Sequence, residues 1–203
     1  SLTGTKLNPP GWLAFDAFFA NNTVIYNYQI RHKDGTLTSY GSAPSDYSTD
    51  VVSNWTIKKM KKAYALTPGK PIFFYVNPSS IHSPHMPAPR HLNDARCTNI
   101  QPWKPANYNE ADVSDKPKYV RDLALDPNVQ GYNIKVQCEM MLSVDDMVGK
   151  IANELTLQGK LDNTIFILTA DNGHAFKEHR LPGKTTPYHT AVPLYISWPA
   201  GGG

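Results

Sequence analysis

Three short, unbroken apolar runs constrain what this chain can fold into. They cover residues 71–76, 163–170 and 192–197. Continuous apolar runs of this length are typical of strands that are buried on both faces, as they are in parallel sheets. These runs therefore predict a sheet whose two faces are covered by other elements.

Two helices are predicted, one before the run at 71–76 and one between the runs at 71–76 and 163–170. With Ser48 as the capping residue, residues 49–63 carry apolar side chains at helical spacing. A longer apolar repeat at intervals of three and four begins near Gln137, and Gly159 stands where that helix would end. Strands that alternate with helices predict an α/β fold with a mostly parallel central sheet flanked by helices.

Two further segments have distinct patterns. Residues 24–30 lead into Asp34-Gly35, which predicts a strand followed by a hairpin turn. Residues 78–135 are rich in proline and show little periodicity, a combination that indicates a long loop region that is functional or partly mobile.

The charge pattern does not point to any class of partner. Twenty basic residues against seventeen acidic residues leave a net charge of +3, and these charges are scattered along the chain. This pattern gives no argument for nucleic acid or for a membrane surface. No run approaches the roughly 18 apolar residues of a membrane span. The first residues resemble neither a signal peptide nor a natural start, so we expect the chain to be a piece of a longer protein.

Two sequons and two cysteines bear on the compartment. The triplets Asn21-Asn22-Thr23 and Asn54-Trp55-Thr56 fit the N-glycosylation pattern and favour a secretory route, whether extracellular, periplasmic or lysosomal. Cys97 and Cys138 could form a disulfide or could both be buried thiols.

Candidate metal ligands follow the run at 163–170. In α/β sheets ligands bind outside the carboxyl ends of the strands, and Asp171-Asn172 offer a carboxylate and an amide oxygen there. A plain turn closing the strand is the alternative. The residues that follow include His179, Arg180 and Lys184, and cations beside an anionic group are what sulfuryl and phosphoryl transfer require. Lys184 could also be an ordinary exposed lysine.

Two histidines follow the run at 71–76. His82 and His85 each precede a proline by two positions, so the backbone that carries them is stiff. Histidine exchanges a proton near neutral pH more readily than other side chains, which makes both residues candidates for acid–base chemistry. The alternative is a pair of surface histidines in a proline-rich loop.

Several segments together resemble the type I sulfatases of the alkaline-phosphatase superfamily. In chain order they are Pro10-Gly11-Trp12, Tyr26-Asn27-Tyr28, residues 46–51, residues 71–74, His82-Ser83-Pro84, residues 162–173, residues 178–184 and Val192-Pro193-Leu194. The resemblance is collinear over residues 9–200 and is closest to the arylsulfatases and N-acetylglucosamine-6-sulfatases. It implies that residues 1–203 are an incomplete sulfatase catalytic domain, the portion that follows the nucleophile.

The resemblance also implies roles for individual residues. Asp171 and Asn172 match ligands of a Ca²⁺ ion, with Mg²⁺ as an alternative. Lys184 matches the lysine that contacts the sulfate group, and His82 matches the histidine that protonates the leaving group, with His85 as the fallback. His85 and His179 are expected to bind substrate. The expected reaction is hydrolysis of an aryl or carbohydrate sulfate ester to an alcohol and inorganic sulfate.

The chain departs from the family pattern in ways that affect activity. The family's formylglycine nucleophile comes from a Cys/Ser-x-Pro-Ser-Arg motif, which this chain lacks. Residues 42–46 match the first four positions of the motif, but Asp46 replaces the arginine at the fifth. The early Asp-Asp metal pair is also missing, and His189 stands where relatives often have Glu. We therefore expect the isolated chain to be inactive.

Two other functional readings remain open from the sequence. One is a phosphodiester or phosphonate hydrolase of the same superfamily, although Asn172 in place of a histidine disfavours its two-zinc members. The other is a non-catalytic, degenerate module.

Overall fold

The computed structural model describes residues 9–20, 24–184 and 190–201. The chain divides into two compact units, each made of two segments. Unit 1 contains Ser1–Thr98 and Val136–Leu157, and unit 2 contains Asn99–Lys135 and Gln158–Gly203.

Unit 1 begins with a three-stranded antiparallel sheet. Its strands are β1 (Asp16–Phe19), β2 (Tyr28–His32) and β3 (Leu37–Tyr40), in the order β1-β2-β3. The predicted hairpin is confirmed, because the turn at Asp34-Gly35 joins β2 to β3 and Gly35 has a φ of 88°. The strand begins later than predicted, because Asn27 has a left-handed backbone with a φ of 56°, which extended structure does not allow.

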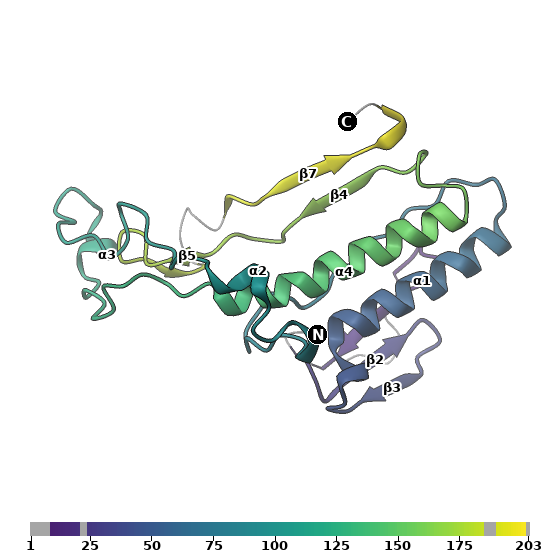
Figure 1. Cartoon of the computed structure of the whole chain (residues 1–203), viewed down its shortest axis with the longest axis horizontal. Helices are drawn as coiled ribbons and strands as arrows, with labels where there is room; N and C mark the ends of the chain where they lie inside the picture. The colour runs from purple at the N-terminus through teal and green to yellow at the C-terminus, as the bar shows by residue number, and fades with distance from the viewer. Residues whose placement is uncertain (1–8, 21–23, 185–189, 202–203) are drawn as a thin grey trace. The chain divides into compact units, whose positions relative to one another are not determined.

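Helix α1 (Ser48–Leu66) packs against this sheet (Figure 1). Tyr28 and Ile30 of the sheet and Val51 of the helix form one buried cluster. The short 3₁₀ helix η1 (Pro44–Asp46) precedes α1, whose N-cap position is occupied by Tyr47. The helix confirms the predicted periodicity, but Ser48 is its first helical residue rather than its cap.

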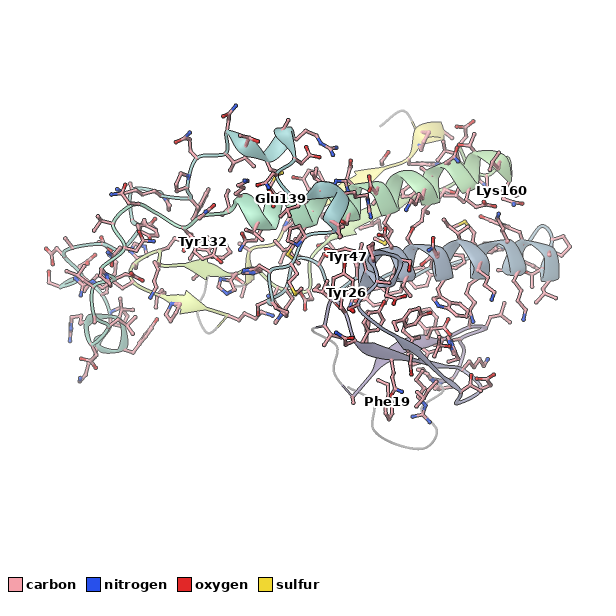
Figure 2. The ribbon with its side chains drawn as sticks, turned by 60° about the horizontal axis from the view of Figure 1, so that its bottom comes forward. Phe19, Tyr26, Tyr47, Tyr132, Glu139 and Lys160 are labelled. Atoms are coloured by element: carbon pink, nitrogen blue, oxygen red, sulfur yellow. A yellow bond between two sulfur atoms is a disulfide. The ribbon has the colours of Figure 1, made fainter. Side chains whose placement is uncertain are left out.

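Helix α4 (Lys135–Leu157) runs beside α1 in unit 1 (Figure 1). Lys61 on α1 forms an ion pair of 3.3 Å with Glu154 on α4. A buried cluster joins residues from four places in this unit and consists of Ile25, Tyr47, Ala88 and Met140. Figure 2 shows Tyr26 close to Tyr47 at the start of α1, with ring centroids 5.7 Å apart.

Two short helical segments of unit 1 lie between α1 and α4 along the chain. They are η2 (Pro89–His91) and α2 (Ala95–Thr98), both in unit 1. Cys97 in α2 forms a disulfide with Cys138 in α4, so the two cysteines pair. Arg90 donates to Asp50 on α1 and to Asp146 on α4, and so connects the two helices.

Unit 2 contains two small antiparallel sheets. Strands β4 (Phe166–Thr169) and β7 (Leu194–Ser197) form one, and β5 (Ala175–Phe176) and β6 (Pro182–Gly183) form the other. Its helical segments are α3 (Lys118–Arg121) and η4 (Pro199–Gly201). The core of the unit is the buried cluster of Val113, Val120, Ala175 and Leu181.

The predicted parallel central sheet is wrong for the described residues, where every named strand pairing is antiparallel. β4 and β7 pair antiparallel because the chain between them turns back through the β5–β6 hairpin. The apolar run at 71–76 contains no assigned strand, and its Phe73 is 74 % exposed. An apolar run becomes a strand only where a neighbouring backbone pairs with it through hydrogen bonds. The amino-acid composition of the run does not determine whether such a neighbour is present.

None of the helices in the described parts of the chain is long and apolar enough to cross a membrane. The sequon at Asn54 lies on α1, where Asn54 is exposed and the Thr56 hydroxyl donates to the carbonyl of Val52 at 2.8 Å. The sequon at 21–23 lies outside the described residues.

Candidate catalytic site

The loop that carries the candidate histidines belongs to unit 1 and is anchored at its two ends. The Thr49 hydroxyl at the start of α1 lies 2.8 Å from the Ser80 hydroxyl, and the Tyr47 hydroxyl donates to the carbonyl of Met86 at 3.1 Å. Tyr47 is fully buried, and this burial raises the pKa of its phenol, which keeps the hydroxyl protonated as a donor. Residues at the start of α1 therefore anchor the loop both before and after the two histidines.

His82 is exposed on this loop, and one of its ring nitrogens already forms a hydrogen bond. Its Nδ1 lies 2.6 Å from the carbonyl oxygen of Ser83. Because a carbonyl can only accept a hydrogen bond, Nδ1 carries the proton of that bond. The other nitrogen, Nε2, is therefore the ring atom suited to exchange a proton with a reacting group.

His85 is also exposed, three residues further along the loop. The amide nitrogen of Gln137 on α4 lies 3.3 Å from its Nε2 and 3.4 Å from its Nδ1. This contact ties His85 to α4, whereas the His82 ring contacts Ser83 within its own loop.

The candidate metal ligands lie directly after β4 in unit 2, as the apolar run predicted. Asp171 is exposed and Asn172 is half-buried. The Asn172 amide nitrogen donates to the carbonyl of Gly173 at 2.9 Å, so the side-chain oxygen of Asn172 is the atom suited to a cation. The pair offers oxygen donors only, which fits a hard cation such as Ca²⁺.

The pair does not make a metal site by itself. In the described ranges, no group of three or more His, Cys, Asp or Glu side chains is arranged to hold a metal ion. Ca²⁺ takes six to eight oxygen ligands, so Asp171 and Asn172 fit as part of a larger donor set.

Lys184 follows immediately after the β5–β6 hairpin of unit 2, and its side chain is exposed. The hairpin is short, with Ala175 paired to Gly183 and Phe176 paired to Pro182. Ala175 and Leu181 are buried in the core of the unit, so the hairpin is fixed on its inner side. The lysine therefore projects from the end of an anchored element.

His179 lies in the turn of this hairpin, and a residue that the sequence did not single out holds it. Its Nδ1 is 2.5 Å from the carboxylate of Glu110, and the Asn107 amide nitrogen is 3.1 Å from its Nε2. Glu110 and His179 are 69 residues apart in the chain. No spacing in the sequence predicts this contact, because it depends on how the proline-rich segment folds back.

The predicted site residues are thus distributed over the two units. His82 and His85 belong to unit 1, and Asp171, Asn172, His179 and Lys184 belong to unit 2. His189 lies outside the described residues. Within unit 2, the metal-ligand pair and the lysine flank the same hairpin, one before β5 and the other after β6.

The sequence matches the model of the sulfatase family over residues 7–202. It is 32 % identical to an arylsulfatase from Volvox carteri over 94 % of this chain and 33 % of that protein. It is 26 % identical to the N-acetylglucosamine-6-sulfatase of Capra hircus over 94 % of this chain and 34 % of that protein. The chain therefore spans about a third of the length of these relatives.

The fold is similar to that of solved sulfatase-type structures. The structure of BT4656 in complex with its substrate D-glucosamine-2-N,6-O-disulfate aligns with a TM-score of 0.70 at 19 % identity, covering 95 % of this chain and 50 % of that one. Together, the match to the family model and the arylsulfatase similarity show that the chain belongs to the sulfatase family.

Proposed function

We propose that the full-length gene product containing this chain hydrolyses sulfate esters, and that this chain supplies part of the catalytic machinery. The observation that supports this most is the family match over residues 7–202, which encloses every candidate residue. The site chemistry is consistent with it, because an exposed lysine and oxygen ligands for a cation both suit an anionic sulfate group.

Lys184 and His82 have different proposed roles. The Lys184 ammonium group binds sulfate oxygens as a point charge in both the ground state and the transition state. His82 donates a proton from Nε2 to the ester oxygen as the bond between sulfur and that oxygen breaks, so the product leaves as a neutral alcohol. The hydrogen bond between Nδ1 and Ser83 orients the ring for this transfer.

Asp171 and Asn172 are the residues of this chain that would hold Ca²⁺. The ion supplies positive charge to the sulfate group when bound. Since Asp171 and Asn172 supply two donors of the six or more that Ca²⁺ requires, we expect the isolated chain to bind Ca²⁺ at this pair no better than millimolar. Micromolar affinity at this pair in a calorimetric titration would contradict this expectation.

The proposed roles are tested with sulfate esters whose leaving groups have graded pKa values. In the full-length gene product, His82→Ala should lower turnover by roughly 10²–10⁴-fold for alkyl or sugar sulfates, and much less for nitrophenyl sulfate, which departs without a proton. Lys184→Ala should weaken binding and turnover across the whole series. The control is His85→Ala.

Three outcomes would contradict these roles. If His85→Ala showed the dependence on leaving group while His82→Ala did not, His85 would be the acid. If Lys184→Ala left binding and turnover unchanged, that residue would not contact sulfate. If phosphate diesters were turned over much faster than sulfate esters, the protein would be a phosphodiester hydrolase.

The 203-residue chain alone should show no turnover of 4-nitrocatechol sulfate above background, even with added Ca²⁺. The physical reason is that it has no Cys/Ser-x-Pro-Ser-Arg motif to supply the nucleophile. Activity that disappears on Ser42→Ala would mean that residues 42–46 do act as such a motif.

We also propose that the protein follows a secretory route. The disulfide and the exposed Asn54 support this proposal, because disulfides persist in oxidising compartments. On expression through a eukaryotic secretory pathway, a glycosidase that removes N-glycans should lower the apparent mass, and Asn54→Gln should remove part of that shift. An unmodified Asn54 by mass spectrometry would contradict glycosylation at this site.

A further inference from the structure

The turn between β5 and β6, residues 177–180, has an unusual backbone. Lys177, His179 and Arg180 have positive φ angles of 78°, 48° and 65°. Residues with side chains seldom adopt this left-handed conformation, and several within one turn persist only where surrounding structure holds them. We call residues 177–180 the strained turn.

Backbone hydrogen bonds attach the strained turn to residues 107–109. The Asn109 N–H donates to the carbonyl of Lys177 at 2.7 Å, and the His179 N–H donates to the carbonyl of Asn107 at 2.7 Å. These bonds cross between segments about 70 residues apart in the chain and lie wholly within unit 2.

Arg180 strengthens the attachment with its side chain. Its guanidinium group donates to the carbonyl oxygens of Glu110, Ala111 and Leu123 at 2.8, 2.6 and 3.0 Å. A planar guanidinium group that is bonded to three carbonyls has little freedom to contact a substrate. Arg180 is therefore committed to holding the turn in place.

The Glu110 carboxylate adds a side-chain contact to the attachment of the strained turn. It bonds His179 Nδ1 at 2.5 Å, while the Asn107 amide lies 3.1 Å from His179 Nε2. Both ring nitrogens of His179 are thus engaged by this segment, and the His179 side chain is only 22 % exposed. This environment suits a residue that holds backbone in place better than one that binds substrate.

The strained turn lies close to Lys184 along the chain. After Arg180, the N–H of Leu181 donates to the carbonyl of Glu178 at 2.8 Å, and the buried Leu181 leads directly into β6. Lys184 is the residue after β6. From these contacts we propose that Glu110 is a positioning residue that acts through His179 to set the place of Lys184, and that His179 positions the hairpin rather than binding substrate.

This inference rests on the proposed role of Lys184 in sulfate binding, and a double-mutant cycle in the full-length gene product tests it. The variants are Glu110→Ala, Lys184→Ala and their combination, assayed for kcat/KM with 4-nitrocatechol sulfate. Glu110→Ala should lower kcat/KM by roughly 10–100-fold, the order expected for a displaced catalytic group. In the Lys184→Ala background the same change should lower it by no more than about threefold, because the residue it positions is gone.

Two further variants separate positioning from loss of fold. Glu110→Gln keeps an oxygen that can accept from His179 and should lose less activity than Glu110→Ala. Asp122→Ala removes an exposed carboxylate from the same part of the chain, where it forms an ion pair with Lys118, and should stay within about twofold of wild type. Circular dichroism should show the same fold for all variants that are compared.

The outcomes distinguish this inference from the function on which it rests. If the loss in kcat/KM of the double variant equals the product of the losses of the two single variants, Glu110 does not act through Lys184. That result would overturn the positioning role of Glu110 while leaving Lys184 as a sulfate-binding residue. A Lys184→Ala variant with wild-type kcat/KM would overturn the role of Lys184 and the inference with it. If Glu110→Ala unfolds, the same cycle with Glu110→Gln decides the question.

Discussion

The hydroxyl of the fully buried Tyr47 donates a hydrogen bond to the carbonyl of Met86 at 3.1 Å, across 39 residues of chain. This bond joins the start of α1 to the loop that carries His82 and His85. The acid–base candidates therefore depend on a core tyrosine for their position, although neither histidine is buried.

Removing this hydroxyl should weaken the fold as well as the loop. Tyr47→Phe keeps the ring but leaves the Met86 carbonyl without its buried donor, so the free energy of unfolding should fall by about 1–2 kcal/mol. Urea denaturation measures the change. Tyr75→Phe is the matched control, because Tyr75 is 71 % exposed and its hydroxyl should contribute almost nothing. Equal unfolding midpoints for the two variants would contradict the proposed anchoring.

The disulfide between Cys97 and Cys138 should make a large contribution to stability. It closes a loop with a sequence separation of 41, for which the chain-entropy model gives about 4 kcal/mol. A variant with both cysteines changed to serine should therefore melt at a markedly lower temperature than the oxidised wild type. Reduced wild type is the control and should melt near the double variant. An unchanged melting temperature would show that the closed loop adds no stability.

Asp146 should make stability depend on pH in the acidic range. Burial acts to raise the pKa of this carboxyl, but hydrogen bonds from His91 and Arg90 outweigh it and the pKa is lowered. A group with a lowered folded-state pKa stabilises the protein above its unfolded pKa of about 3.9, and this stability is lost as the pH falls through the folded-state value. Asp146→Asn should therefore melt below wild type near pH 6, and the difference should shrink below about pH 3.

The exposed neighbour Asp145 provides the control for this measurement. Asp145→Asn should change the melting temperature little at either pH. A difference between wild type and Asp146→Asn that stays constant from pH 6 to pH 2 would mean that the ionised Asp146 does not contribute through these hydrogen bonds.

The β4–β7 pair should make the isolated chain prone to association. Ile167 and Ile196 are paired in register and are 63 % and 61 % exposed. The next residue on each strand points to the opposite face, and Leu168 and Tyr195 are 44 % and 66 % exposed as well. Exposed apolar strands with free edges are templates for pairing between molecules.

Changing both isoleucines to threonine should reduce association while keeping β-branched side chains that favour a strand. Light scattering of the 203-residue chain measures the effect, and binding of a hydrophobic dye should fall in parallel. Leu157→Thr is the control, because Leu157 is 73 % exposed at the end of α4 and away from these strands in the chain. An equal reduction in the control would show that the paired strands are not the cause.

The helices and several site positions could be predicted from the sequence because their signals are local. The apolar repeat starting near Gln137 predicts α4, which spans Lys135–Leu157. The run at 163–170 predicts β4, and with it the position of Asp171 and Asn172 just beyond a strand. A period of 3.6 or an unbroken apolar run depends only on neighbouring residues, so it is visible without the fold.

The tertiary structure alone decided strand pairing and the partners of individual side chains. The run at 71–76 is as apolar as the segment that forms β4, yet it contains no assigned strand, because a strand is defined by a neighbour that bonds to it. Glu110 meets His179 across 69 residues, and Tyr47 meets Met86 across 39. The sequence by itself determined where helices α1 and α4 and strands β4 and β7 form. Long-range hydrogen bonds and burial, which join residues far apart in the chain, decided which segments come together and whether an apolar run becomes a strand.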